Sequence, residues 1–161
     1  MLFRSLEAGD AKEAIRKWGG QREGLRTFER ARELRTTLRE MVGRIVAGQA
    51  VLQSALDVIN GLLRHRLGYA QLTKARGGFE RRFHVETEEA IHLLAPIAES
   101  ASDLLAHCDF SLIKRCKNRA CILYFYDTTK NHARHWCSMS ICGNRMKVAE
   151  YYRRKRRTKG Q

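Results

Sequence analysis

Proline is nearly absent from the sequence: Pro96 is its only example among 161 residues. Because proline marks turns and loops, its scarcity argues against long structureless segments. The chain also lacks any apolar run near the roughly 20 residues that a membrane-spanning helix needs. Its first 18 residues lack the apolar core of a signal peptide. We therefore expect a cytoplasmic protein that is not a membrane protein.

Acidic residues become scarce after residue 110. Residues 1–110 hold 17 Lys and Arg against 15 Asp and Glu, whereas residues 111–161 hold 14 against two. The last third of the chain therefore carries most of the formal net charge of +14. A field of this sign attracts phosphate polyanions, anionic membranes or acidic proteins. This shift in charge predicts two domains, 1–110 and 111–161.

Residues 1–110 are predicted to be mainly helical. Apolar residues recur at three- and four-residue spacings over about 10–18, 21–47 and 50–66, which is typical of amphipathic helices. Asp10 and Glu13 have the spacing of a capping box at the start of the first helix. The core positions predicted for the second and third helices are Leu25, Phe28, Ala31, Leu34, Leu38, Met41, Ile45, Leu52, Leu56, Ile59 and Leu63. Apolar positions on helix 21–47 can also support a homodimer.

Two further elements complete this domain. Tyr69 and Leu72 precede an Arg76-Gly77-Gly78 turn and Phe79 follows it, which indicates a β-hairpin. A last helix is predicted to be capped by Thr87, with an inward stripe and a kink or break at Pro96. Its inward positions are Ile91, Leu94, Ala98, Ala101 and Leu105. The fold class predicted for the chain is α+β, mainly helical with small β elements.

Four of the five cysteines form one pattern: C-x4-C, a gap of 15 residues, and a second C-x4-C. Zinc prefers tetrahedral thiolate coordination, and two short cysteine pairs separated by a hairpin-sized gap supply it. Cytoplasmic thiols stay reduced, which favours a metal site over disulfides. The pattern predicts one structural Zn2+ per chain, held by Cys116, Cys121, Cys137 and Cys142.

The segment between the two cysteine pairs is predicted to be a hairpin. Residues 122–126 are a dense β-type run, 127–131 are turn-forming, and 132–136 lead back to the second pair. A helix over about 143–157 would follow, so that Cys142 lies near its N-terminus. Knuckle, hairpin and helix together make a treble-clef-like zinc finger.

The sequence also allows other interpretations of individual residues. His132 or His135 can replace one cysteine ligand, and Cys108 is expected to be a small buried core residue. Asp127 is expected to stabilise the hairpin turn or to pair with an arginine. Four protein ligands leave no open position for water, and the sequence shows no nucleophile–base pair or phosphate-binding glycine loop. We therefore expect a protein that is not an enzyme.

Cations surround the cysteine pattern and neutralise phosphates well. If residues 143–157 are helical, Arg145 and Arg153 share a face, with Val148, Tyr151 and Tyr152 packed mainly on the other side. Asn144 and Arg145 have the chemistry to read base edges, and equally to cap the helix and hydrogen-bond a cysteine sulfur. The residues predicted to contact nucleic acid are Lys114, Arg115, Lys117, Arg119, Lys130, Arg134, Asn144, Arg145, Lys147, Arg153, Arg154, Arg156 and Arg157.

The segment from Cys116-x4-Cys121 through Trp136-Cys137-Ser138-Met139 to Cys142-Gly143-Asn144-Arg145 resembles the CGNR zinc-finger family. The resemblance implies a bacterial protein in which the finger follows a mainly helical domain, described as a putative stress-induced transcription regulator. It also implies that the four cysteines bind zinc and that Gly143, Asn144, Arg145 and the basic tail contact DNA. Members usually begin with a strand around Leu-Asp-Phe-x-Asn-Thr, which this sequence lacks.

A zinc-dependent, DNA-binding transcriptional regulator is the leading functional hypothesis, with residues 1–110 sensing a signal or dimerising. The sequence names no small-molecule effector. One alternative is an RNA- or ribosome-binding module in which Tyr124, Phe125, Tyr126 and Trp136 stack on bases, although packing around zinc is the simpler role for these rings. Another is a protein-interaction adaptor whose finger is purely structural. Gly143 is expected to allow a tight backbone approach beside a ligand.

Overall fold

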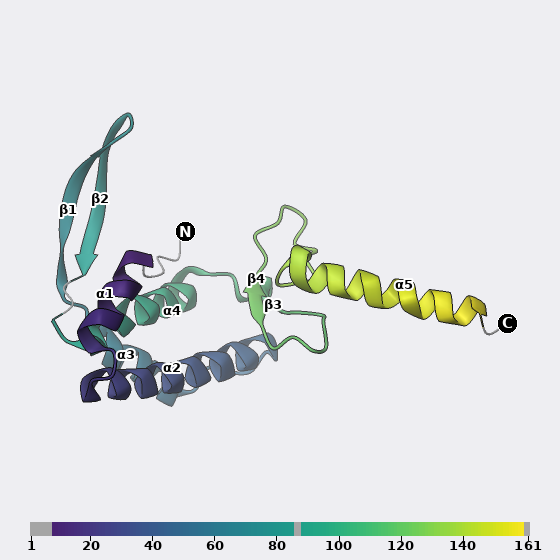
Figure 1. The fold of residues 1–161 in the computed structure, drawn as a ribbon, viewed down its shortest axis with the longest axis horizontal. Helices are drawn as coiled ribbons and strands as arrows, with labels where there is room; N and C mark the ends of the chain where they lie inside the picture. The colour runs from purple at the N-terminus through teal and green to yellow at the C-terminus, as the bar shows by residue number, and fades with distance from the viewer. Residues whose placement is uncertain (1–7, 86–87, 160–161) are drawn as a thin grey trace. The chain divides into compact units, whose positions relative to one another are not determined.

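The computed structural model describes residues 8–85 and 88–159 (Figure 1). Helices predominate in it, and two small antiparallel hairpins accompany them, so the predicted α+β class is confirmed. The chain forms two compact units. Unit 1 contains Met1–Met41 and Val51–Cys108, and unit 2 contains Val42–Ala50 and Asp109–Gln161.

Three helices open unit 1, as the apolar spacing predicts. They are α1 (Ala8–Trp18), α2 (Arg22–Val46) and α3 (Gln53–Leu63). Helix α1 begins two residues before Asp10, so the predicted capping box does not mark its start. The ends of α2 and α3 lie within a few residues of the predicted ones. The last residues of α2, from Val42 onward, belong to unit 2.

Pro96 divides the next helical segment in two, as predicted. A short 3-10 helix, η1 (Ala90–Leu94), leads directly into α4 (Ala95–His107). Pro96 lies in the first turn of α4, where a backbone N–H would have no partner within the helix and its loss therefore costs little. The proline begins α4 rather than kinking a longer helix. The proposed cap, Thr87, lies outside the described residues.

The predicted hairpin of unit 1 consists of β1 (Gly68–Ala75) and β2 (Gly78–Val85). The two strands pair in antiparallel register from Gly68 opposite Val85 to Ala75 opposite Gly78. The connecting loop is Arg76–Gly77, and Gly77 has a φ of 88°, a conformation that a side chain would strain. The hairpin extends away from the helices of its own unit (Figure 1).

The core of unit 1 consists of aliphatic and small side chains from the helices, with one tryptophan. Its buried apolar residues are Trp18, Leu34, Met41, Ala55, Ile59, Leu62, Ala90, Leu94, Ala95, Ala98 and Ala101. The predicted inward positions Leu94, Ala98 and Ala101 of the last helical segment are thus confirmed.

The predicted inner face of α2 is wrong in its first turns. Leu25 and Phe28 are 61% and 63% exposed. The stripe that meets the core instead continues backwards from Leu34 through Thr27 to Gly24, one position away from the two predicted residues. A Cβ on Gly24 would lie 2.2 Å from the carbonyl oxygen of Trp18, so close packing at the α1–α2 turn fixes this rotation. Leu52 is also exposed, because it precedes α3 as its N-cap.

Two polar contacts join helices of unit 1. The backbone N–H of Ala90 donates to the Glu23 carboxylate at 2.5 Å, so a side chain of α2 caps η1. Arg66, which follows α3, forms an ion pair with Glu99 of α4. Each contact joins a residue that precedes the β1–β2 hairpin in the sequence to a residue that follows it.

Truncating the buried and exposed leucines of α2 tests this arrangement. Leu34→Ala removes a side chain that is 2% exposed and is expected to lower the free energy of unfolding by about 2–5 kcal/mol. Leu25→Ala is the matched control on the same helix and is expected to change it by less than about 0.5 kcal/mol. Denaturant unfolding followed by far-UV circular dichroism measures both. Equal losses for the two variants would contradict the assigned face of α2.

Candidate metal centre

The first cysteine pair lies in the loop of a small hairpin in unit 2. Strand β3 (Ile113–Arg115) pairs with β4 (Tyr124–Tyr126) in antiparallel register, and Cys116 and Cys121 lie between them. The backbone N–H of Cys116 donates to the carbonyl of Leu123 at 3.0 Å, which continues the ladder to the first ligand. The sequence thus folds the first knuckle as the tip of a two-stranded ribbon.

This pairing corrects the predicted hairpin, in which residues 122–126 were to pair with 132–136. The partner of β4 is the preceding strand β3, and 132–136 form no strand. The N–H of Asp127 donates to the carbonyl of Leu112 at 2.8 Å, after which the chain leaves the ladder. Strand β3 has only three residues, which are too few to show the alternation of apolar and polar residues that predicts a strand. The sequence pattern therefore indicated residues 132–136 as the partner of β4.

The second cysteine pair lies at the start of the last helix. A single turn of π-helix, η3 (Met139–Gly143), leads directly into α5 (Asn144–Lys159). The N–H groups of Cys142 and Gly143 both donate to the carbonyl of Ser138 at 3.0 Å, and the Ser138 hydroxyl accepts from the N–H of Ile141. This turn places Cys142 beside the beginning of α5, as predicted.

The four sulfur atoms converge on one point. All four lie within 4.8 Å of one another, and Cys137 Sγ is 3.7 Å from the Sγ atoms of both Cys121 and Cys142. A tetrahedron with zinc–sulfur bonds of about 2.3 Å has edges of about 3.8 Å, whereas a disulfide bond measures about 2.05 Å. The donor set and its spacing therefore fit a tetrahedral metal ion, and the cluster contains neither His132 nor His135.

Asn118 supports the cluster from inside the first knuckle, a role that the sequence analysis missed. Asn118 is buried, and its side-chain Nδ2 donates to Cys142 Sγ at 3.5 Å, while its backbone carbonyl accepts from the N–H of Cys121 at 2.8 Å. One residue of the first pair's loop thereby contacts a ligand of the second pair. Such a contact orients a ligand and tunes its charge. A single asparagine between two cysteines gives no signal for it in the sequence.

The environments of the thiols differ. Burial raises the pKa of the Cys116 thiol, but hydrogen bonds from the backbone N–H groups of Cys137 and Asn118 outweigh burial and lower that pKa to about 7. Burial, together with the sulfur atoms of Cys142 and Cys121, raises the pKa of Cys137 to about 12. Without a cation, these environments favour ionisation of Cys116 over ionisation of Cys137.

Two side chains crowd the position where a Cβ on Gly143 would lie. A Cβ at this position would lie 2.5 Å from Met139 Sδ and 3.0 Å from Trp136 Cδ1. The glycine is itself buried. The backbone beside the last cysteine of the cluster is therefore packed closely against the Met139 and Trp136 side chains, and any larger residue at position 143 would have to displace them.

Asp127 organises the loop between β4 and the second cysteine pair. Its carboxylate is fully buried and accepts from Lys114 Nζ at 2.7 Å, from the Thr129 hydroxyl at 2.6 Å, and from the N–H of Arg134 at 2.9 Å. Burial raises the pKa of this carboxyl, but these donors outweigh it and hold the pKa well below its usual range. The turn-stabilising role is confirmed, and the cation that pairs with Asp127 is a lysine rather than an arginine.

Two cations predicted to contact nucleic acid are used within the finger. Lys114 donates to Asp127 and to the carbonyl of His132. Arg134 donates from Nε to the carbonyl of Trp136 at 2.8 Å and from Nη2 to that of Cys137, and its guanidinium lies 4.8 Å from the ring centre of Phe125. Both side chains support the loop that carries the second cysteine pair.

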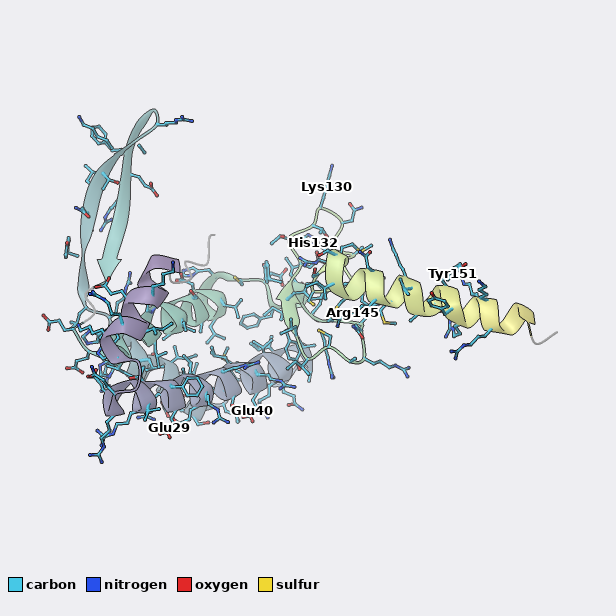
Figure 2. The ribbon with its side chains drawn as sticks, viewed as in Figure 1. Glu29, Glu40, Lys130, His132, Arg145 and Tyr151 are labelled. Atoms are coloured by element: carbon cyan, nitrogen blue, oxygen red, sulfur yellow. The ribbon has the colours of Figure 1, made fainter. Side chains whose placement is uncertain are left out.

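The remaining predicted contact residues face solvent, as far as the structure describes them. These are Arg115, Lys117, Arg119, Lys130, Asn144, Arg145, Lys147, Arg153, Arg154 and Arg156. The side chain of Arg157 lies outside the described residues. Asn144 Nδ2 donates to the carbonyl of Ser140 at 3.2 Å, so this side chain bonds the π-helical turn and not a sulfur atom. Figure 2 shows Lys130 on the loop after β4 and Arg145 near the beginning of α5.

The aromatic residues divide into two groups. Tyr124, Phe125, Tyr126 and Trp136 are half-buried around the metal centre, which weakens the interpretation that they stack on bases. Tyr151 and Tyr152 of α5 are exposed, as is Val148, so the predicted packing of this side of the helix is wrong. Helix α5 extends away from the rest of unit 2 after its first turns (Figure 1), which agrees with the exposure of these three side chains.

Cys108 differs from its predicted role. It is half-exposed and caps the C-terminus of α4, so it is not part of the core. It also lies outside the four-sulfur cluster. These properties make it a matched control for the cysteines at the metal centre.

Comparison with known families agrees with this architecture. A model described as a putative stress-induced transcription regulator (ABATE) matches residues 5–107, and the CGNR zinc finger model matches residues 113–155. The order of the two matches confirms the resemblance found in the sequence. A search of the curated proteins gave no match. Within the described residues, no helix is long and apolar enough to cross a membrane.

Replacing one cysteine of the cluster tests the metal centre. Cys137→Ser is expected to reduce bound zinc from one ion per chain to nearly none, because a structural zinc supplies about 10–16 kcal/mol toward folding of such small units. Cys108→Ser is the control and is expected to keep the ion. Elemental analysis and near-UV circular dichroism measure zinc content and finger structure. A Cys137→Ser protein with a full complement of zinc and an ordered finger would refute the ligand assignment.

Zinc binding should also depend on pH, because Zn2+ must displace the proton that Cys137 holds at neutral pH. Binding that releases protons becomes tighter as pH rises. We expect the logarithm of the apparent zinc association constant to rise by at least about one per pH unit between about pH 7 and 8. Competition with a chelator of known affinity measures this slope. A constant affinity across that range would show that the thiols are already ionised before zinc binds.

Proposed function

Because the chain belongs to the ABATE family of putative stress-induced transcription regulators and carries a CGNR zinc finger, we propose that it is a zinc-dependent, DNA-binding transcription regulator. In this proposal it acts in the cytoplasm and is not an enzyme. The observation that carries the proposal is an exposed basic helix, α5, that begins at the four-cysteine cluster.

The size and charge of α5 suit the major groove of duplex DNA. An α-helix with its side chains is about 10–12 Å across, and the groove is about 12 Å wide. The 16 residues of α5 include eight Lys and Arg and one acid, Glu150. Glu150 forms ion pairs with Arg153 and Arg154, which leaves the helix strongly cationic. Such a helix gains affinity by releasing the counterions of the phosphates.

The metal would act by fixing the start of this helix. Cys142 lies two residues before Asn144, and Gly143 packs against Met139 and Trp136, so the first turn of α5 is held to the cluster. Zn2+ bound by the four thiolates supplies the cross-link between the two cysteine pairs and takes no part in chemistry. Arg145, exposed in the first turn, is the residue best placed for contact with a base edge.

The closed donor set supports a structural role for the metal. Four cysteine sulfurs complete a tetrahedral shell and leave no position for a water or substrate. The half-buried aromatic residues around the cluster provide little surface on which to stack single-stranded bases. Both observations favour duplex DNA over catalysis and over RNA binding.

Removing three cations from one face of α5 tests the proposal. Arg145, Arg153 and Arg156 share a face at helical spacing, and their joint replacement by Gln is expected to lower the log–log salt slope of duplex binding by about 2–3, at about 0.9 per phosphate contact. Arg32→Gln, Arg35→Gln and Arg39→Gln together remove the same charge from the exposed side of α2 and serve as the control. Fluorescence anisotropy with a mixed-sequence duplex at several salt concentrations gives the slopes.

The outcomes separate the alternatives. Unchanged binding by the α5 variant would remove this helix from the DNA interface. Equal losses in the α5 and α2 variants would show that only net charge matters. Preference for single-stranded RNA over duplex by the native protein would support the RNA-binding alternative, and weak binding to both would favour a protein-interaction adaptor.

A further inference from the structure

The β1–β2 hairpin of unit 1 is long, and none of its described side chains belongs to the buried apolar core. Each strand has eight residues, longer than the usual five or six, and each strand has the other as its chief packing partner. A ribbon of two strands is marginally stable by itself in water. A long ribbon that supports little of its own unit's core suggests a use outside that core.

One face of the hairpin near its turn combines apolar and cationic side chains. Side chains of directly paired residues lie on the same face, so Leu72 and Arg81 share a face with Lys74 and Phe79. Leu72 is 66% exposed and Phe79 is 71% exposed. Lys74 and Arg81 are exposed too, and Arg76 is exposed in the turn.

Charge identifies the kind of partner. Residues 68–85 hold four Lys and Arg against one acid, Glu80, whereas residues 1–110 as a whole are close to neutral. Cations along open strand edges oppose pairing with a second copy of the same strand, because like charges would meet. The same cations attract a polyanion. The charge pattern therefore favours a phosphate-bearing partner over self-association through the hairpin.

Duplex DNA fits the shape of this element. A two-stranded antiparallel ribbon is narrow enough to enter a DNA groove, and several DNA-binding proteins use strands in this way. An exposed phenylalanine beside cations also matches the apolar side chains that architectural proteins insert between base steps. We propose that the tip of the hairpin, residues 72–81, is a second duplex-DNA contact of this protein. Lys74, Arg76 and Arg81 lie on phosphates in this arrangement, and Phe79 lies in the groove.

This inference rests on the proposed function for its partner, DNA, but it concerns a different surface. A tip variant with Lys74→Gln, Arg76→Gln and Arg81→Gln removes the three cations from exposed positions. In the zinc-loaded protein it is expected to lower the salt slope of duplex binding by about 2–3. The triple α2 variant defined above is again the charge-matched control, and far-UV circular dichroism confirms that each variant is folded.

Comparison of the tip variant with the α5 variant separates the two proposals. Loss of slope in both supports two contacts. A tip variant that binds like the native protein, while the α5 variant loses affinity, overturns the hairpin contact alone. The reverse result supports the hairpin contact and overturns the role of α5. If the tip variant changes the sedimentation coefficient of the free protein and leaves the slope intact, the hairpin is a self-association surface and the inference is wrong.

A second measurement reports on Phe79 without removing charge. Phe79→Trp places an indole at the exposed tip, and the signal from Trp18 and Trp136 is subtracted by titrating the native protein in parallel. Addition of duplex DNA is expected to quench the new emission and to reduce its accessibility to acrylamide. Emission and accessibility that stay unchanged at saturating DNA would overturn the placement of Phe79 in the groove.

Discussion

Four sulfur atoms within 4.8 Å of one another are the constraint on which unit 2 depends. Among its described residues the buried side chains are few and mostly polar or sulfur-bearing: Ile113, Cys116, Asn118, Asp127 and Cys142. Such a set cannot supply the apolar burial that stabilises an ordinary domain. A divalent cation bound by the four cysteines would replace that core, because it would displace their remaining protons and join the two cysteine pairs in one cross-link. This cross-link would hold the β3–β4 hairpin and the first turn of α5 in their places.

Asp127 offsets part of the excess positive charge of the same unit. Residues 111–161 carry two acids, and Asp127 is the one buried inside the finger. It neutralises Lys114 and gathers donors from Thr129 and Arg134, so one carboxylate holds both ends of the loop. A buried carboxylate with this many donors keeps its charge and prefers a single geometry. The loop can then present the second cysteine pair without an apolar core of its own.

The sequence predicts the residues that chemistry restricts most, and fails where geometry decides between similar options. The four-cysteine cluster was predictable because two cysteine pairs at short spacing are typical of structural zinc sites. The break at Pro96 was predictable because proline lacks a backbone donor. The partner of β4 was not, because β3 has three residues and the alternation there is too short to select it. The predicted burial of Leu25 and Phe28 was wrong for a related reason. A stripe of residues one position away on α2 has the same spacing, and the close contact between Gly24 and Trp18 turns that stripe toward the core. Asn118 acts through one hydrogen bond to a sulfur, which no periodicity reveals.

The two proposed DNA contacts differ in the way they are stabilised, and this difference gives them different roles. Helix α5 starts beside the four-cysteine cluster, which a bound metal ion would hold rigid, so its first turn could present Arg145 in a fixed orientation, as base recognition requires. The described part of the hairpin contains no cluster of metal ligands, and it carries flexible lysine and arginine side chains beside an exposed phenylalanine, which suits contact with phosphates and groove walls of any sequence. Two contacts on one chain also raise the effective concentration of the second once the first is made. A weak, sequence-independent contact in unit 1 would therefore lengthen the residence of the finger on DNA without altering which bases it prefers.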